Sequence, residues 1–166
     1  PPCQGFSYAG WRDPNDKRNQ LFRDFVELVK RIKPEFFVME NVLGILTMRK
    51  GEAIKEIVEA FEEIGYHVNA PLKLNAANFG VPQKRKRVII IGSLNPDISI
   101  KQPLPLFEED SLELPPFVTV RDAIGNLPHI EDGGGDLEMD FEFESKSPYD
   151  MLMQKEIDFD KFYELM

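Results

Sequence analysis

The sequence predicts an α/β fold, because segments with helix and strand patterns alternate along the first part of the chain. Residues 21–33 and 51–65 place apolar side chains three and four positions apart, as an amphipathic helix does. Residues 36–39, 67–76 and 87–93 are short and either apolar or alternating, as strands are. The order helix, strand, helix, strand, strand therefore predicts one sheet that is covered by helices.

The first predicted helix has one apolar face, formed by Phe22, Phe25, Val29 and Ile32. Pro34 ends this helix, because proline disfavours helical geometry in the residue before it. The run FFVM at residues 36–39 follows. A continuous apolar run is typical of a strand that is buried on both faces in a parallel sheet.

The second predicted helix has its own apolar face, formed by Ile54, Ile57, Val58, Phe61 and Ile64. Gly65 is its expected C-terminal cap. The two strands that follow are joined by the turn segment NFGVPQ at residues 78–83. Because this connection is short, we expect these two strands to be antiparallel.

The net charge of −9 is distributed unevenly along the 166 residues. Residues 1–101 hold 16 Lys and Arg against 12 Asp and Glu, a balance of +4, whereas residues 102–166 hold 4 against 17, a balance of −13. Affinity for phosphate depends on locally placed basic residues, so the acidic average does not exclude nucleic-acid binding. The basic residues gather in QKRKR at residues 83–87.

Prolines and glycines interrupt the chain from Asn95 onward, and GGGD at residues 133–136 is a flexible sequence. The last stretch, residues 147–166, has the composition of one or two helices. We therefore divide the chain at residue 101 and interpret residues 102–166 as an acidic, partly ordered extension rather than a second compact domain.

Cys3 is the only cysteine, and two interpretations of it stay open. Unpaired cysteines are most often small buried apolar residues. Here two prolines fix the backbone before the thiol, and a rigid loop ahead of a helix is also where nucleophiles are displayed. A single cysteine excludes an internal disulfide. The sequence contains no run of about 18 apolar residues, which is the length that would predict a membrane span. We therefore expect a cytoplasmic protein.

Two further groups of polar residues lie next to predicted strands. Glu40 and Asn41 follow the FFVM strand directly, and side chains at the carboxyl end of a strand point toward the ligand crevice of open α/β sheets. Burial there would favour a carboxyl that donates a proton, although a charged residue at a strand end is also common. Gln83, Arg85 and Arg87 alternate before the last strand, so we expect them on one face, where guanidinium groups can hold a carbonyl or a phosphate.

In this order, PPCQGFS, LFRDFVELVKRIKPEFFVMENV and LNAANFGVPQKRKRVIIIG closely resemble the cytosine-5 DNA methyltransferases of bacterial type. The resemblance covers residues 1–130 and includes VTVRDAIGNLP at residues 118–128. It implies a partial Rossmann-like fold of S-adenosylmethionine-dependent methyltransferases, namely the C-terminal half of the mixed sheet with its flanking helices. It also implies a chain that begins inside the enzyme.

The resemblance assigns roles to individual residues. Cys3 is implied to be the nucleophile that attacks carbon 6 of a flipped-out cytosine, and Glu40 is implied to donate a proton to ring nitrogen 3. Arg87 is implied to hold oxygen 2, with Arg85 supporting the pocket or a nearby phosphate. The implied contacts to the base or the DNA are Gln4, Ser7, Arg18, Asn41 and Gln83.

The resemblance also implies the cofactor and the partners. S-adenosylmethionine is the implied cofactor, with only Pro2 near it and its main site upstream; no metal is implied. The implied partners are double-stranded DNA, the upstream part of the catalytic domain, a downstream target-recognition region and a cognate restriction endonuclease. Two alternatives stay open: a transfer-RNA cytosine methyltransferase of the same fold, which tends to have threonine where Ser7 lies, and a non-catalytic split subunit.

Overall fold

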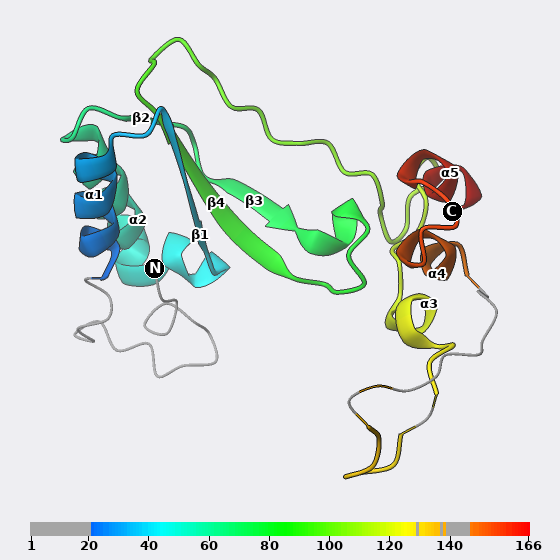
Figure 1. Ribbon diagram of the computed structural model, residues 1–166. Helices are drawn as coiled ribbons and strands as arrows, with labels where there is room; N and C mark the ends of the chain where they lie inside the picture. Colours follow the sequence, from blue (N-terminus) through cyan, green and yellow to red (C-terminus); the bar gives the residue numbers. More distant parts are fainter. Residues whose placement is uncertain (1–20, 129, 137, 139–146) are drawn as a thin grey trace. The chain divides into compact units, whose positions relative to one another are not determined.

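The computed structural model describes residues 21–128, 130–136, 138 and 147–166. Helices and strands alternate in the first part, as predicted, and three short helices follow in the second (Figure 1). The elements are α1 (Leu21–Ile32), β1 (Phe36–Asn41), the 3-10 helices η2 (Leu43–Leu46) and η3 (Met48–Gly51), α2 (Glu52–Glu62), β2 (His67–Val68), β3 (Leu72–Asn75), the 3-10 helix η4 (Ala76–Phe79), β4 (Lys86–Ser93), α3 (Val120–Ile124), α4 (Pro148–Met153) and α5 (Phe159–Leu165).

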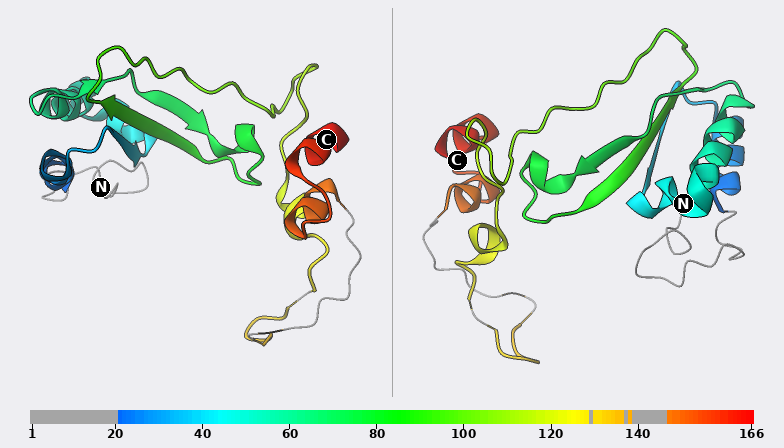
Figure 2. Two further views of the ribbon diagram at one scale, coloured as in Figure 1. Left: turned by 45° about the horizontal axis from the view of Figure 1, so that its top comes forward. Right: turned by 180° about the vertical axis from the view of Figure 1, so that it is seen from behind.

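The chain divides into two compact units, and each is described by itself. The first unit comprises residues 1–75 and 86–104, and the second comprises residues 76–85 and 105–166. The helices of the first unit, α1 and α2, lie on the same side of its sheet (Figure 2).

The sheet of the first unit is antiparallel at every pairing in the described residues. β4 lies at its centre and pairs with β1 on one side and with β2 and β3 on the other. The expected antiparallel pairing of the last two strands is thus confirmed. The predicted strand over residues 67–76 is interrupted, because Asn69, Ala70 and Pro71 separate β2 from β3 and proline has no N–H to offer the ladder.

The FFVM strand was predicted to be buried on both faces, and this prediction is wrong for the described residues, because only one face is buried. Side chains of β1 alternate between exposed and buried, and Phe36 and Val38 are 42% and 59% exposed. Phe37 and Met39 point to the other face and join the core beneath α1 and α2. A continuous apolar run gives no information about which of its two faces the helices of the same chain cover.

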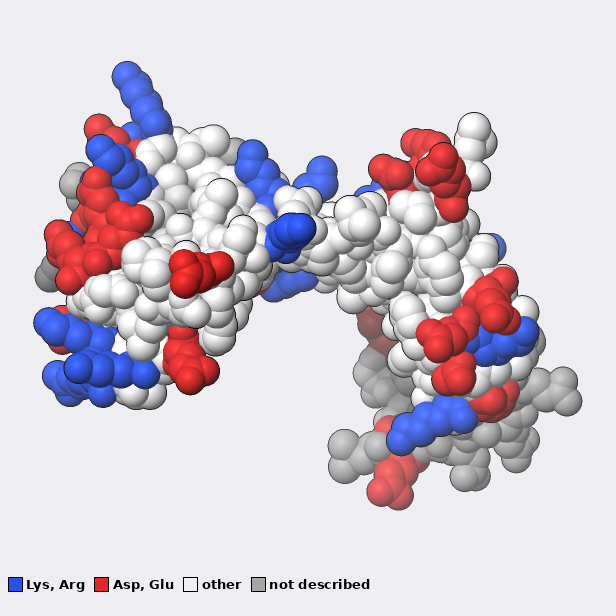
Figure 3. All heavy atoms as spheres, turned by 90° about the horizontal axis from the view of Figure 1, so that it is seen from above, with Lys and Arg blue, Asp and Glu red and all other residues white. Residues whose placement is uncertain are grey.

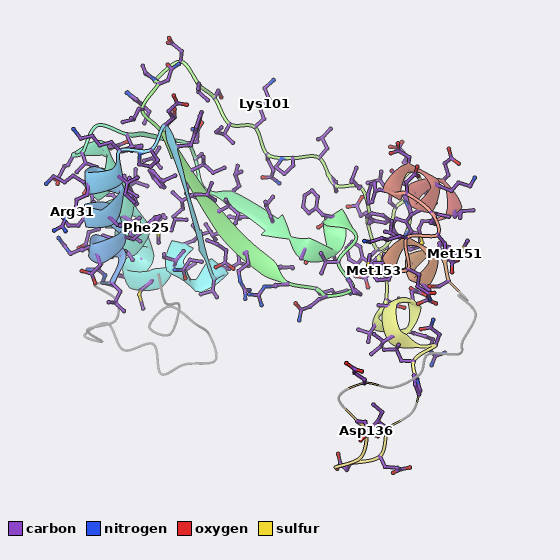
Figure 4. All side chains as sticks on the ribbon, in the orientation of Figure 1. Phe25, Arg31, Lys101, Asp136, Met151 and Met153 are labelled. Carbon is purple, nitrogen blue, oxygen red and sulfur yellow. The ribbon has the colours of Figure 1, made fainter. Side chains whose placement is uncertain are left out.

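The core of the first unit is built around aromatic rings. The rings of Phe37 and Phe61 stack with centroids 3.9 Å apart, and Phe25, labelled in Figure 4, meets both of them edge-on. The hydroxyl of Tyr66 donates a hydrogen bond to the Pro34 carbonyl at 2.6 Å, and burial raises the pKa of this phenol. Strand β1 is therefore fixed to the chain that follows α2.

At the C-terminal ends of α1 and α2, one prediction is wrong and one is confirmed. Ile32, assigned to the apolar face of α1, is 64% exposed, so that prediction is wrong; Val26 is buried instead. The chain turns away at Lys33, whose φ is +51°, so Ile32 lies beyond the packed part of the helix. Gly65 adopts a left-handed φ of +92°, and the next N–H, of Tyr66, bonds to the Phe61 carbonyl, which confirms the expected cap of α2.

A glycine permits the close approach of β4 to the Phe37 ring. Gly92 pairs with Phe37 across the strands, and a β-carbon at position 92 would lie 2.2 Å from the Phe37 Cε1 atom. We therefore expect Gly92→Ala to destabilise the protein by about 1–3 kcal/mol through overpacking. Urea unfolding of the full-length protein measures this effect.

A Phe37→Leu background provides the control for Gly92→Ala, because leucine removes the ring that the new methyl group meets. The cost of Gly92→Ala should fall markedly there. An equal cost in both backgrounds would show that the loss arises from the strand backbone and not from the ring.

The second unit has a small core of its own, formed by Phe107, Val118 and Phe162. Its helices α3 and α4 both begin with a capping box: Thr119 with Asp122, and Ser147 with Asp150. The prediction of a partly ordered extension over residues 102–166 did not include this core, in which side chains near the two ends of the segment, Phe107 and Phe162, pack together. The division of the chain at residue 101 into two functional regions stays a prediction.

The charged residues of the second unit are mostly acidic, and Figure 3 shows acidic side chains in red on the face in view. Across the segments described, none of the helices has the length and apolar character needed to cross a membrane.

Candidate active site

Two of the predicted site residues meet on neighbouring strands. Glu40 lies on β1 and Arg87 lies on β4, and the Arg87 Nε group donates a hydrogen bond to Glu40 Oε1 at 2.7 Å. Arg87 also donates from Nη1 to the Lys86 carbonyl at 2.8 Å, which fixes the plane of the guanidinium group. The antiparallel register of β1 and β4 thus brings together two motifs that are 47 residues apart in the sequence.

The Glu40 side chain is 48% exposed and that of Arg87 is 24% exposed. The expected burial of Glu40 is therefore absent in the described chain. Glu40 lies on the same face of β1 as Phe36 and Val38, opposite the face that α1 and α2 cover. Within the described residues, a carboxyl and a guanidinium group thus lie side by side on the face of the sheet opposite α1 and α2.

Asn41 is fully buried at the end of β1. Its Oδ1 atom accepts a hydrogen bond from the Val42 N–H at 2.9 Å, which turns the chain into η2. Its Nδ2 group has no hydrogen-bond partner within the described residues. A buried donor without a partner costs free energy, so Asn41 is available to order a neighbouring polar group.

The expectation that Gln83, Arg85 and Arg87 alternate on one strand face is wrong. Strand β4 begins only at Lys86, so the alternation does not extend back to Gln83 and Arg85. The Gln83 N–H bonds to the Val81 carbonyl at 2.7 Å in a tight bend, and the Arg85 carbonyl accepts from the Ala76 N–H at 3.0 Å. Gly80 and Pro82 lie in this turn, and strand periodicity does not apply to it.

Gln83 lines a hollow of about 540 Å³ in the second unit. The other residues around this hollow are mostly apolar, with one basic and one acidic side chain: Ala77, Pro82, Lys84, Glu109, Pro116, Phe117, Val118, Thr119 and Val120. Lys84 and Glu109 form an ion pair at its edge.

Sequence reasoning missed two residues that support this turn. Asn78 donates from Nδ2 to the Phe107 carbonyl at 2.8 Å, and its own carbonyl accepts from the Leu106 and Phe107 N–H groups. Gly80, with a φ of +81°, lies against the Phe107 ring. Because 29 residues separate Asn78 from Phe107, no local pattern could have indicated the contact.

Five predicted site residues, Pro2, Cys3, Gln4, Ser7 and Arg18, lie outside the described residues. Within the described ranges, no group of three or more His, Cys, Asp or Glu side chains could hold a metal ion. Neither the hollow lined by Gln83 nor a second one beside α2, lined by Leu46, Ile54, Lys55, Val58, Glu59, Glu62, Pro71 and Lys73, contains a glycine. Neither hollow therefore offers a glycine-rich turn for S-adenosylmethionine, and the expectation that its main site lies upstream stays a prediction.

A family model described as C-5 cytosine-specific DNA methylase matches residues 1–147. The chain belongs to this family. It is 43% identical over 158 residues to the Type II methyltransferase M.DdeI of Desulfomicrobium norvegicum, covering 93% of this chain and 37% of that protein. It is 48% identical over 128 residues to the Type II methyltransferase M.BsuRI of Bacillus subtilis, covering 76% of this chain and 29% of that protein.

The chain thus spans about a third of the length of the curated relatives it matches. Among solved structures it is similar to an E. coli prophage-encoded protein assigned as a DNA modification methyltransferase, with 34% identity and a TM-score of 0.57. That match covers 78% of this chain and 34% of the E. coli chain. With the α/β order described above, it confirms a partial Rossmann-like methyltransferase fold.

Proposed function

We propose that this chain carries the cytosine-binding part of a DNA (cytosine-5)-methyltransferase. The observation that carries the proposal is the Glu40–Arg87 pair, because it joins the Glu-Asn-Val and Gln-x-Arg-x-Arg motifs of the family in one place. Ring nitrogen 3 and oxygen 2 of cytosine are adjacent on one edge of the base. A carboxyl and a guanidinium group that lie side by side match that edge.

In the proposed mechanism, the Cys3 thiolate adds to carbon 6 while Glu40 donates a proton to nitrogen 3. The sulfur–carbon bond forms as the electrons of the carbon 5–carbon 6 double bond shift onto carbon 5, and Arg87 holds oxygen 2 throughout. Once carbon 5 carries the transferred methyl group, a base removes the proton from carbon 5, and the electrons of that carbon–hydrogen bond re-form the carbon 5–carbon 6 double bond and expel the Cys3 thiolate. Nitrogen 3 returns its proton to Glu40, which restores the aromatic ring and the acid. Asn41 orders this pocket, and Gln4, Ser7, Arg18, Gln83 and Arg85 contact the DNA.

The target cytosine must leave the double helix before Cys3 can reach it, which costs a few kcal/mol of unstacking and unpairing. S-adenosylmethionine supplies the electrophilic methyl group. We propose that its site lies mainly in an upstream part of the catalytic domain, with Pro2 beside it, and that the 166 residues are inactive alone. The exposed side chains of β1, Phe36 and Val38, would then contact that upstream part.

We propose duplex DNA as the substrate, a target-recognition region downstream, and a restriction endonuclease as functional partner, in the bacterial cytoplasm. Both curated relatives named above are Type II methyltransferases, and Ser7 also favours DNA over transfer RNA.

The test is the transfer of labelled methyl from S-adenosylmethionine by the full-length protein to duplex DNA and to transfer RNA. We expect label in DNA alone. Label in transfer RNA alone would replace the proposed substrate. Label in neither nucleic acid would favour a non-catalytic subunit.

A further inference from the structure

Lys84 lies between Gln83 and Arg85, and its side chain extends toward the acidic segment Glu108–Asp110. The ammonium group donates hydrogen bonds to both carboxylate oxygens of Glu109. It also lies 5.8 Å from the centroid of the Phe117 ring, so the cation faces an aromatic surface. The Glu109 carboxylate therefore occupies the position in which another anion with two oxygen atoms would accept hydrogen bonds from the Lys84 ammonium group.

The backbone of the second unit holds Glu109 in this position. Glu109 follows two residues after Phe107, which is fully buried and bonded through its backbone to Asn78. The loop closes where the Glu108 N–H bonds to the Pro115 carbonyl at 2.9 Å. The ion pair therefore joins two anchored segments and does not result from a chance meeting of long side chains.

The pair is easy to exchange, because both side chains remain largely exposed: 60% for Lys84 and 58% for Glu109. Exposed ion pairs contribute little to stability, so breaking one costs little. A backbone phosphate presents two non-bridging oxygens and one negative charge, as a carboxylate does, and lysine binds either anion. The hollow beside the pair leaves room for an incoming ligand and is also lined by Gln83.

We propose that Lys84 is a binding site for a DNA backbone phosphate, and that Glu109 occupies this site until the phosphate displaces it. This inference rests on the proposed function. Its consequence is that the acidic segment competes with DNA: Lys84 contributes to binding only after Glu109 has been released. Glu108 and Asp110, which are exposed on the same segment, add further negative charge and repel the DNA backbone.

The test measures affinity of the full-length protein for a fluorescently labelled duplex of mixed sequence, since a phosphate contact does not depend on sequence. Glu109→Gln should tighten binding about fivefold, the value of one exposed ion pair. Glu108→Gln is the matched control, because it removes the same charge from the neighbouring exposed position. Its gain should be clearly smaller.

Lys84→Gln should weaken binding and should make the slope of log affinity against log salt shallower by about 0.9, as the loss of one phosphate contact does. In the Lys84→Gln background, the gain from Glu109→Gln should fall to that of Glu108→Gln. The inference is overturned if Glu109→Gln and Glu108→Gln give equal gains, or if the Glu109→Gln gain persists without Lys84.

Methyl transfer to DNA, measured beside binding with the same protein, separates the two proposals. If the full-length protein methylates DNA but Lys84 and Glu109 are not coupled, only this inference fails. If the full-length protein neither binds nor methylates duplex DNA, the proposed function fails and the inference fails with it.

Discussion

Replacing Cys3 by alanine in the full-length protein should abolish methyl transfer to DNA, with a loss of at least about 10³-fold in kcat. The proposed reaction has no route around the thiolate, because carbon 5 becomes nucleophilic only after carbon 6 has been attacked. General acid donation from Glu40 and the cation of Arg87 act on the same addition and do not replace it. Incorporation of labelled methyl into duplex DNA measures the effect.

Binding of duplex DNA provides the control for Cys3→Ala. Affinity should change little, because the thiol contributes almost nothing to contacts with the backbone of DNA. With wild-type protein, a protein–DNA adduct that survives denaturation should be detectable during turnover, and the variant should form none. Turnover by Cys3→Ala within about tenfold of the wild-type rate would exclude covalent catalysis by this residue.

The first unit could be predicted well from the sequence because its elements have strong local patterns. The apolar spacing of α1 and α2, the run at β4 and the cap at Gly65 all depend on residues that are close in sequence. The predictions were wrong where contacts between residues distant in sequence determine which side chains are buried. Phe36 and Val38 are as apolar as their neighbours, and only the arrangement of the two helices determines that they are exposed.

The second unit shows the same limit more strongly. Its core joins Phe107 to Phe162 across a long acidic stretch rich in Pro and Gly, and composition alone predicted an extension. The capping boxes at Thr119 and Ser147 are local signals that could have identified α3 and α4. The ion pair of Lys84 with Glu109 depends on how Asn78 fixes the Phe107 backbone, which no sequence pattern indicates.

The candidate site was predicted as a set of residue types but not as a geometry. The resemblance assigned Glu40 and Arg87 to the same cytosine, but their direct contact follows only from the register of β1 against β4. This register also explains why Glu40 is half-exposed: its position in β1 points away from the face that α1 and α2 cover. The contact turns two candidate residues into one acid–cation pair.

Glu40→Gln in the full-length protein should lower kcat by about 10²- to 10⁴-fold, the usual contribution of a positioned general acid. Glutamine keeps the size of the side chain and can still accept a hydrogen bond from Arg87 Nε, but it cannot transfer a proton to nitrogen 3. Kinetics with duplex DNA should therefore show a large effect on kcat and a small one on KM.

Glu35→Gln is the matched control for Glu40→Gln, since Glu35 is exposed just before the opposite end of β1 and lies outside the proposed site. It should leave both kcat and KM within about twofold of wild type, as surface substitutions usually do. A Glu40→Gln variant that loses affinity while keeping its kcat would show that Glu40 only orients Arg87. The proton for nitrogen 3 would then have to come from another group, and the Glu40–Arg87 pair would be a binding element without an acid role.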